Sequence, residues 1–243
     1  MPFFFHKSAR RYSPELVCHR DAVKKLLLCI PITLLLSYIF VNYPQTDLFF
    51  SQKFYSATTG TFPYLDSMIF TVINRSAYFI AAAFFFLHIK FLFVKPLPKN
   101  NKRHKHDLLL FLLGPVLTVQ IFCKKLFGRA RPESIVEFGG TQEFSPAFMI
   151  SGECSFNCSF VSFHAALATV LFLYQRNFSK GYKKSAYSTV TLSLITLYST
   201  IKLAQGRHFL SDIIFSICFI FILDTLISIG LRGKAHSVNI RSL

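Results

Sequence analysis

Residues 209–231 read FLSDIIFSICFIFILDTLISIGL, an apolar run whose charged residues are Asp212 and Asp224. A helix needs roughly 20 apolar residues to cross the hydrocarbon core of a bilayer, so this stretch predicts a transmembrane helix. The rest of the 243-residue chain has the same character, with 52% hydrophobic residues, 30 Phe and only 16% charged residues. These apolar residues run in blocks, whereas in a soluble domain they would alternate with polar ones. We therefore expect an all-α, polytopic membrane bundle.

Six apolar blocks divide the chain. The first begins only after Lys24-Lys25, and no small-residue cleavage site follows it closely, so we expect a retained helix rather than a cleaved signal peptide. We expect a basic cytoplasmic arm over residues 1–25, a single membrane-embedded domain over 26–231 and a cytoplasmic tail over 232–243. The predicted spans are residues 26–43, 73–94, 107–123, 160–175, 186–204 and 209–231.

The strong positive charge has two interpretations. The formal net charge is +16, and the basic run Lys99–His106 would suit a nucleic-acid partner. Most cations, however, gather at alternate ends of the predicted spans, as the positive-inside rule requires, and such segments gain about 1 kcal/mol per cation near an anionic leaflet. We therefore expect both termini in the cytoplasm, anionic lipid headgroups as partners of the cytoplasmic loops, and no nucleic-acid partner.

This topology places three polar fragments at the same outer face of the membrane. Residues 124–132, KKLFGRARP, follow the third span; residues 161–164, VSFH, open the fourth; and residues 202–212 surround the turn between the fifth and sixth. Together they supply cations, a hydroxyl and two imidazoles, one of which has a carboxylate four residues on. That inventory suits holding a phosphate and breaking a bond to it without a metal, so we expect one composite site and no cofactor.

His208 and Asp212 are the most informative pair in this set. If the last span begins near Phe209, they share a helix face one turn apart. A carboxylate behind an imidazole fixes its tautomer and stabilises its charged form, which leaves the other ring nitrogen free to attack. An ionisable residue inside an apolar helix also indicates function by default. The alternative is that Asp212 merely pairs with Arg207 or another loop cation.

His164 stands at the outer start of the fourth span, just after Ser162. A second imidazole opposite a nucleophile is what a general acid needs in order to protonate a leaving oxygen. The N-terminus of a helix also offers free backbone N–H groups to an anion. The alternative is a histidine with a structural role only.

Lys124 and Arg131 bracket a short basic turn that ends at Pro132. Arginine forms bidentate bonds to phosphate oxygens and lysine adds a point charge, so we expect both to bind phosphate. The alternative is that such cations snorkel to the membrane surface from a helix end. That interpretation suffices for Lys125 and Arg129.

Two of the six cysteines, Cys154 and Cys158, fall in the long outer segment 132–160. A local disulfide is expected if this segment faces an oxidising compartment, and two free thiols are the alternative. A Cys-x3-Cys pair without partner ligands is a poor zinc signal, so no metal site is expected here.

The three fragments resemble the signature of the type 2 phosphatidic acid phosphatase superfamily, whose site is also found in vanadium haloperoxidases. That signature reads Lys-x6-Arg-Pro, then Pro-Ser-Gly-His, then Ser-Arg-x5-His-x3-Asp. The resemblance covers residues 107–225, and residues 157–162 and 206–212 are most similar to the bacterial lipid A phosphatase branch. The shared residues are Lys124, Arg131-Pro132, Ser162, His164, His208 and Asp212.

The resemblance implies a helical bundle and a role for each shared residue. His208 would carry a phosphohistidine intermediate, His164 would be the general acid for the leaving group, and Asp212 would orient His208. The other shared positions would hold the phosphate, namely Lys124, Arg131 and Ser162.

Four positions depart from the signature. Val161 replaces Pro, Ile201 replaces Ser, and Phe163 replaces Gly beside the phosphate, where its N–H can still donate but a positive φ becomes costly. Lys202 replaces Arg, so the positive charge survives without the planar fork. Arg207 is a candidate to compensate for that loss. These changes suggest narrowed substrate choice, weakened activity or a catalytically dead relative.

The sequence thus predicts metal-independent dephosphorylation of a membrane lipid at the outer, periplasmic face of a bacterial inner membrane. Lipid A or a related phospholipid would be the substrate. One alternative is a phosphotransferase that moves phosphate between two lipids through the same intermediate. Another is a lipid-phosphate binder or small transporter without turnover. A haloperoxidase is disfavoured because those members of the superfamily are typically soluble.

Overall fold

The computed structural model describes residues 14–93, 98–175 and 182–240, and this part of the chain is helical with no β-strand. Three of the elements form one continuous helix, in which α4 continues through the π-helical η1 into α5. The elements are α1 (Pro14–Asn42), α2 (Gln45–Gln52), α3 (Met68–Phe93), α4 (Pro98–Phe111), η1 (Leu112–Cys123), α5 (Lys124–Phe127), the short 3-10 helices η2 (Pro132–Ser134) and η3 (Val136–Phe138), α6 (Phe163–Tyr174), α7 (Tyr182–Ala204) and α8 (Leu210–Ile240).

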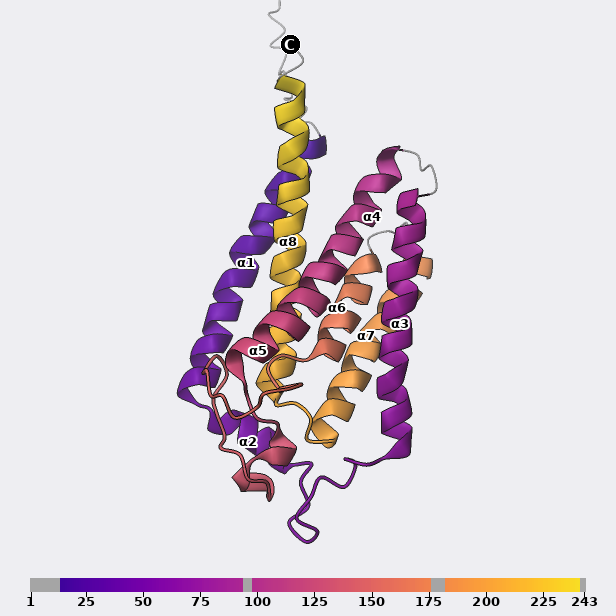
Figure 1. Cartoon of the computed structure of the whole chain (residues 1–243). Coiled ribbons are helices and arrows are strands. Elements are labelled where there is room, and N and C mark those ends of the chain that lie inside the picture. Colours follow the sequence, from indigo (N-terminus) through magenta and orange to yellow (C-terminus); the bar gives the residue numbers. More distant parts are fainter. Residues whose placement is uncertain (1–13, 94–97, 176–181, 241–243) are drawn as a thin grey trace, which may run out of the picture.

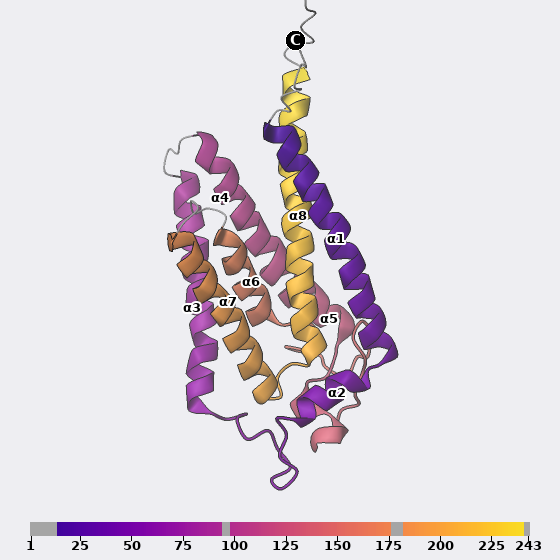
Figure 2. The ribbon, with the colours of Figure 1, turned by 180° about the vertical axis from the view of Figure 1, so that it is seen from behind.

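The long helices run along a common direction, and the connecting segments that the structure describes gather at one end of the bundle (Figures 1 and 2). That end carries α2, the loop between α2 and α3, and the long segment between α5 and α6. The described part of α1 begins, and α8 ends, at the opposite end. The bundle therefore separates a loop-rich end from the end that holds the two terminal helices.

Four helices are long and apolar enough to cross a membrane: Asp21–Asn42, Met68–Lys90, Arg103–Ser134 and Leu210–Leu231. They correspond to the first, second, third and sixth predicted spans. The fourth predicted span appears as α6, which is apolar but only 12 residues long. The fifth appears as α7, which has 23 residues but is rich in Ser and Thr. The chain is a membrane protein whose described residues are all-α and include four helices that meet both criteria.

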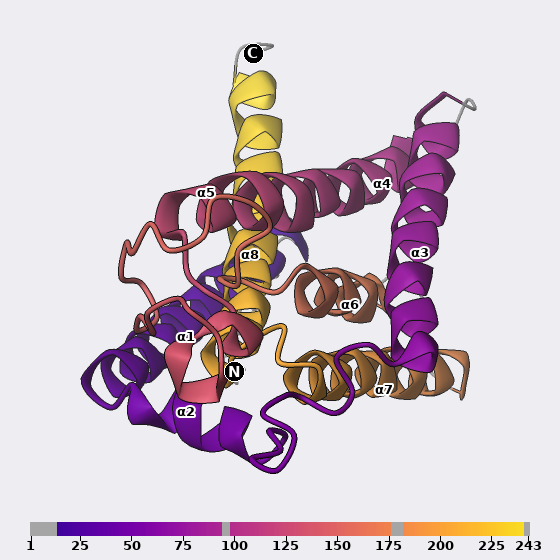
Figure 3. The ribbon, with the colours of Figure 1, turned by 60° about the horizontal axis from the view of Figure 1, so that its bottom comes forward.

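The short helix α6 lies in the middle of the bundle, surrounded by α3, α4, α7 and α8 (Figure 3). Every residue from Phe163 to Leu171 is buried. A helix that is apolar on all sides suits this central position. By contrast, α1 and α3 expose large apolar side chains such as Leu34 and Phe79, as expected where a helix faces lipid.

The third span contains a π-helical stretch that the apolar pattern did not predict. Pro115 lies within it, and proline lacks the N–H that would continue the α-helical hydrogen bonds. The hydroxyl of Thr118 donates to the carbonyl of Leu113, with Oγ1 and O 2.6 Å apart. Such bulges accommodate an interruption without ending the helix, so the run continues to Phe127.

A second small core lies beneath the loops at the loop-rich end. Its rings pack edge to face, with Phe62 and Phe138 centroids 5.4 Å apart. Gly206 fits against this core with φ +62°, and a Cβ at this position would lie 2.5 Å from the Phe62 ring. Glycine is therefore required here, and the turn that carries His208 is fixed against the aromatic side chains. The core residues are Phe62, Ala130, Ile135, Phe138 and Phe209.

Candidate active site

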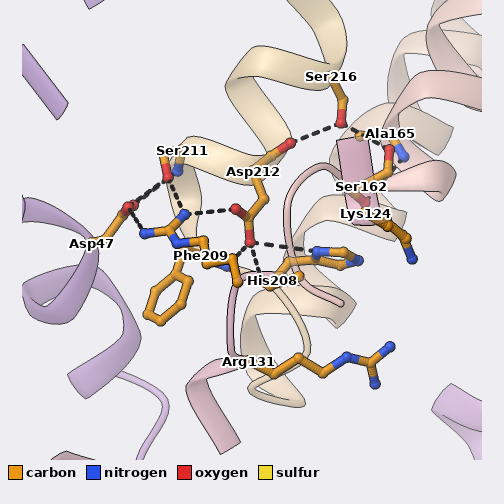
Figure 4. A network of polar contacts seen from close by, with 12 residues as sticks. Asp47, Lys124, Arg131, Ser162, Ala165, His208, Phe209, Ser211, Asp212 and Ser216 are labelled. Carbon is orange, nitrogen blue, oxygen red and sulfur yellow. Dashed lines mark hydrogen bonds and ion pairs between the residues drawn. The ribbon is translucent and has the colours of Figure 1, made fainter. Parts of the chain in front are cut away.

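The three polar fragments of the sequence meet at the loop-rich end of the bundle. One comprises α5 and the turn after it, one opens α6, and one joins α7 to α8. Figure 4 shows Lys124, Arg131, Ser162, His208 and Asp212 from these fragments in one close-up. The structure thus brings the predicted site residues of separate segments into a single region.

Asp212 is held by donors on both carboxylate oxygens. It lies in the first turn of α8, and its Oδ2 accepts from the N–H of Phe209 at 2.7 Å, which caps the helix. Oδ2 also accepts from the hydroxyl of Ser159. Oδ1 accepts from Nη1 of Arg129 at 2.7 Å. A carboxylate with this many donors stays ionised and keeps one orientation.

His208 lies just before α8 and is buried beside Asp212. Its Nδ1 is 3.5 Å from Oδ2 of Asp212 and makes no hydrogen bond within the described residues. Such catalytic contacts are often long in a free enzyme and shorten when substrate binds. Burial lowers the pKa of His208 to about 4, although Asp212 acts in the opposite direction. The ring is therefore neutral at pH 7, the form that can attack an electrophile.

The N-termini of α6 and α8 are tied together through Ser162. The Ser162 hydroxyl caps α6 by accepting from the N–H of Ala165 at 3.5 Å. Its own N–H donates to the carbonyl of Asp212 at 3.2 Å, and its carbonyl accepts from the hydroxyl of Ser216 at 2.8 Å. The Ser162 hydroxyl hydrogen remains available to an incoming anion, because its cap uses only the oxygen.

His164 occupies the first turn of α6 and is oriented from α3. Its Nε2 lies 3.1 Å from the carbonyl oxygen of Asn74, and the Asn74 side-chain amide donates to Oε1 of Gln205 at 2.6 Å. If Nε2 carries the hydrogen in this contact, Nδ1 is the nitrogen left for a reacting oxygen. Gln205 precedes the turn that carries His208, so α3 links the two histidine segments.

Aromatic rings line the α3 side of His164. The rings of Tyr78 and Phe163 are stacked with centroids 5.7 Å apart. Tyr78 also contacts His164 edge-on at 5.8 Å, and Tyr198 contacts it from α7 at 5.5 Å. The side chain of Phe163, which stands where the signature has glycine, therefore packs against Tyr78 on α3.

Three cations on different segments, Lys124, Arg131 and Lys202, form what we call the cation cluster. Lys124 Nζ donates to Oδ1 of Asn157 at 3.0 Å, and Arg131 donates to the Asn157 carbonyl from Nε at 3.1 Å and Nη2 at 2.7 Å. Lys202 is buried near the end of α7 and close enough to Arg131 and Lys124 for electrostatic interaction. Within the described residues, its ammonium has no ion-pair partner.

Arg207 does not take the place expected of a compensating cation. It forms an ion pair with Glu133, and Glu133 also lies 3.6 Å from Nη1 of Arg131. Glu133 thereby neutralises Arg207 and orients Arg131 from behind. Asp212 pairs with Arg129, a cation of the loop after α5, and not with Arg207. The expected alternative of a loop cation as its partner is therefore observed, together with the contact to His208.

The interpretation of Arg129 as a snorkelling cation is wrong. Its side chain is 1% exposed and forms ion pairs with two carboxylates, Asp47 at 2.8 Å and Asp212 at 2.7 Å. Its Nε donates to the Ser145 carbonyl at 2.8 Å, and its guanidinium lies over the ring of Phe209 at 4.2 Å. We call Asp47, Arg129 and Asp212 the carboxylate network (Figure 4). Lys125, by contrast, is exposed, as a snorkelling lysine would be.

Cys154 and Cys158 are joined by a disulfide with their Cα atoms 5.5 Å apart. The bond closes the short loop that contains Asn157. Asn157 has φ +53°, a conformation that asparagine tolerates better than most residues. This loop therefore delivers both oxygens of Asn157 to the cation cluster.

Sequence reasoning missed Asp47, Asn157 and Ser159. Asp47 and Ser159 contact the motif residues only through tertiary structure, and no spacing rule connects them to it. Asn157 lies in the stretch 157–162 that is similar to the lipid A phosphatase branch, but it is uncharged and belongs to none of the three signature fragments. Among the described residues, no group of three or more His, Cys, Asp or Glu side chains is arranged to hold a metal ion.

Comparison with known proteins places this site in a family. A lipid A 4'-phosphatase from Rhizobium etli is 32% identical over 194 residues, covering 72% of this chain and 75% of the relative. One from Rhizobium leguminosarum is 32% identical over 72% of this chain and 83% of the relative. One from Francisella tularensis subsp. novicida is 27% identical over 75% and 85%. No solved structure matches the chain.

The family model described as the PAP2 superfamily matches residues 105–232. That segment is more than half of the chain and contains all three polar fragments. It begins within α4, so that α1, α2 and α3 precede it. The extent of the match and the similarity to these relatives show that the chain belongs to the PAP2 superfamily.

Proposed function

We propose that this protein is a lipid phosphatase that removes a phosphate group from lipid A, or from a related membrane phospholipid, through a phosphohistidine intermediate. The observation that carries the proposal is a neutral, buried His208, backed by Asp212, beside a cluster of three cations. Family membership and relatives named lipid A 4'-phosphatase support a phosphoric monoester hydrolase and a lipid phosphate substrate.

In the first step, Nε2 of His208 attacks phosphorus in line with the bond to the lipid oxygen. The P–N bond forms as the P–O bond breaks, and the electron pair of that bond goes to the departing oxygen. His164 gives this oxygen a proton. The Nδ1–H of His208 faces Asp212, whose carboxylate stabilises the positive charge that the ring acquires.

In the second step, neutral His164 removes a proton from water as the water oxygen attacks phosphorus. The P–N bond breaks, its electron pair returns to His208, and inorganic phosphate leaves. Both histidines then have their starting protonation states. The same residue acts first as acid and then as base, as microscopic reversibility allows.

The cation cluster supplies the electrostatic stabilisation. Phosphoryl transfer depends mainly on positioning and on compensation of charge at the equatorial oxygens. Phosphate oxygens would replace those of Asn157 as partners of Lys124 and Arg131. Lys202, the Ser162 hydroxyl and the backbone N–H of Phe163 would complete the binding site.

We infer that six helices span the membrane, with α6 and α7 as the fourth and fifth spans. Both lie within the bundle, where neighbouring helices can shield a short or polar span from lipid. The active site would then face the periplasm from the inner membrane, and the basic loops at the other end would contact anionic lipid headgroups in the cytoplasmic leaflet. Residues 1–13 of the basic arm and residues 241–243 of the tail lie outside the described residues.

The test is phosphate release by the detergent-purified protein in excess chelator. The substrates are lipid A, phosphatidylglycerol phosphate, phosphatidic acid and polyprenyl diphosphate. We expect release from at least one lipid, complete loss in His208→Ala and almost complete loss in His164→Ala. The matched control is Lys125→Ala, because Lys125 adjoins Lys124 but is exposed. Full activity in either histidine variant would refute the assignment.

The substitutions at Phe163 and Lys202 favour a second candidate, a lipid-phosphate binder without turnover. Binding that persists in His208→Ala, with no phosphate release from wild type, would support it. Transfer of phosphate to a second lipid, with no free phosphate, would instead identify a phosphotransferase that uses the same intermediate.

A further inference from the structure

Asp47 is a fully buried carboxylate on α2, outside the segment that the family model matches. Its Oδ1 accepts from the N–H of Ser211 at 2.9 Å. Its Oδ2 accepts from Nη2 of Arg129 at 2.8 Å and from the Ser211 hydroxyl. Because a buried charge is tolerated only with such partners, α2 is fixed to the first turn of α8.

Arg129 connects Asp47 to the catalytic pair. Nη1 donates to Oδ1 of Asp212 at 2.7 Å and to the Ser211 hydroxyl at 2.8 Å, while Nη2 serves Asp47. One guanidinium is therefore shared between two carboxylates. Arg129 and Asp212 alone would form a neutral pair, whereas with an ionised Asp47 the network has a net charge of −1. Burial raises the pKa of Asp47, and the neighbouring Arg129 guanidinium acts in the opposite direction.

The remaining negative charge lies on the Asp212 side of His208, where it can stabilise a positive charge on the His208 ring. His208 becomes positively charged when it attacks phosphorus, and a neutral Arg129–Asp212 pair would compensate that charge only weakly. In a buried, low-dielectric site, one unbalanced charge acts strongly. The other charged and titratable groups near the His208 ring are Lys124, Arg131 and His164, and the two cations oppose the protonated ring.

We infer that Asp47 is a positioning residue for the phosphoryl-transfer step: through Arg129 it keeps Asp212 both oriented and electrostatically able to stabilise charged His208. This inference rests on the proposed function. It assigns a role in the site to α2, a helix that the family signature does not include. Asp47 does not contact the reacting atoms and acts only through Arg129 and Ser211.

The test compares Asp47→Asn with the double variant Asp47→Asn/Arg129→Gln. The single variant leaves Arg129 unbalanced and reduces the network charge from −1 to 0. The double variant removes one charge of each sign and restores −1 at Asp212. We expect the single variant to lose roughly 10- to 100-fold in kcat, the range typical of outer-shell partners, with KM little changed. We expect the double variant to recover much of that loss.

The acid limb of the kcat/KM profile gives a second readout. In Asp47→Asn it should move to lower pH, because protonated His208 has lost its net negative neighbour. In the double variant it should return toward the wild-type position. Asp47→Glu, which keeps the charge, should leave the limb in place even if the longer side chain lowers kcat.

Ser51→Ala is the matched control for packing. Ser51 lies on the same helix, is 1% exposed, and its hydroxyl has no hydrogen-bond partner within the described residues. Its activity and pH profile should equal those of wild type. If the double variant is worse than the single one, or the limb stays fixed in Asp47→Asn, the role of Asp47 is only structural and the inference fails.

A titration of the His208 ring by NMR in detergent separates this inference from the proposed function, with His208→Gln used for assignment. A downward shift of the His208 titration in Asp47→Asn supports the coupling even if no lipid is hydrolysed. An unshifted titration in an active enzyme overturns the inference and leaves the phosphatase assignment intact.

Discussion

The carboxylate network and the cation cluster lie on opposite sides of His208, and they differ in how their charges are balanced. In the network, both aspartates are paired with Arg129 and receive further hydrogen bonds. In the cluster, Lys124 and Arg131 share the neutral side chain and carbonyl of Asn157. The charged groups of the network are therefore paired with one another without substrate, whereas the positive charge of the cluster is not neutralised by Asn157 and can bind a phosphate. Under the proposed mechanism, the carboxylate network orients His208 before substrate binds, and the cation cluster binds the phosphate anion.

Substitution of Arg129 or Arg131, two residues apart, should give the largest difference between the two groups. Arg131→Met should lower kcat by about 10²- to 10³-fold, the usual cost of losing one donor to a developing oxyanion, and should leave stability nearly unchanged. Arg129→Met leaves two buried carboxylates without their cation and should lower the free energy of unfolding by about 3–5 kcal/mol. Phosphate release and thermal unfolding in detergent measure both variants. Equal stability losses would show that the cation cluster is structural too.

Asn157 offers a milder way to change the cluster. Asn157→Asp places a carboxylate beside Lys124 and Arg131, where it competes with phosphate for the same donors. Since Asn157 is exposed, the pair should be worth about 0.2–1 kcal/mol, and KM should rise by up to about fivefold with kcat unchanged. Asn157→Gly is the control, because it keeps the positive φ and the carbonyl contact to Arg131. A fall in kcat without a change in KM would show that Asn157 orients the chemistry.

The pH dependence of stability and of kcat/KM tests the protonation state of His208, which contacts the carboxylate network. The pKa of His208 is lowered to about 4 by burial, compared with about 6.5 in an unfolded chain. Between these values the unfolded chain binds a proton that the folded site does not, so stability falls as pH falls through this window. The neutral ring persists to the lower value, so kcat/KM should decline only as pH approaches about 4. An acid limb near the unperturbed histidine pKa would show that another group limits the reaction.

The contrast also explains what the sequence could predict. The residues of the cluster and of the His208–Asp212 pair lie in short fragments at fixed spacing, so their roles could be inferred along the chain. Asp47 is 82 residues from Arg129, and nothing in the intervening hydropathy pattern connects them. Arg129 itself looked like a surface cation because its pairing depends on α2 and α8 folding around it. The shortness of α6 was hidden for a similar reason: its apolar run continues into the irregular segment before Ser162.

Phe163→Gly has the smallest expected effect on turnover of the preferred lipid. It tests the position between Ser162 and His164 at the start of α6. Phe163 opens α6 between Ser162 and His164, and its ring stacks on Tyr78 at 5.7 Å. Because Phe163 is a buried core residue, glycine should lower the free energy of unfolding by about 3–5 kcal/mol, and it would remove the ring that Tyr78 packs against. Since Tyr78 is 53% exposed, the loss of its partner would widen the α3 side of the site. We expect little change in turnover of the preferred lipid and a gain on less favoured lipid phosphates, measured as relative kcat/KM across the lipid panel. Phe163→Leu is the control, because it keeps the bulk. If turnover of every lipid phosphate is unchanged in Phe163→Gly, the substitution of this signature glycine does not shape the site, and substrate choice must depend on other residues.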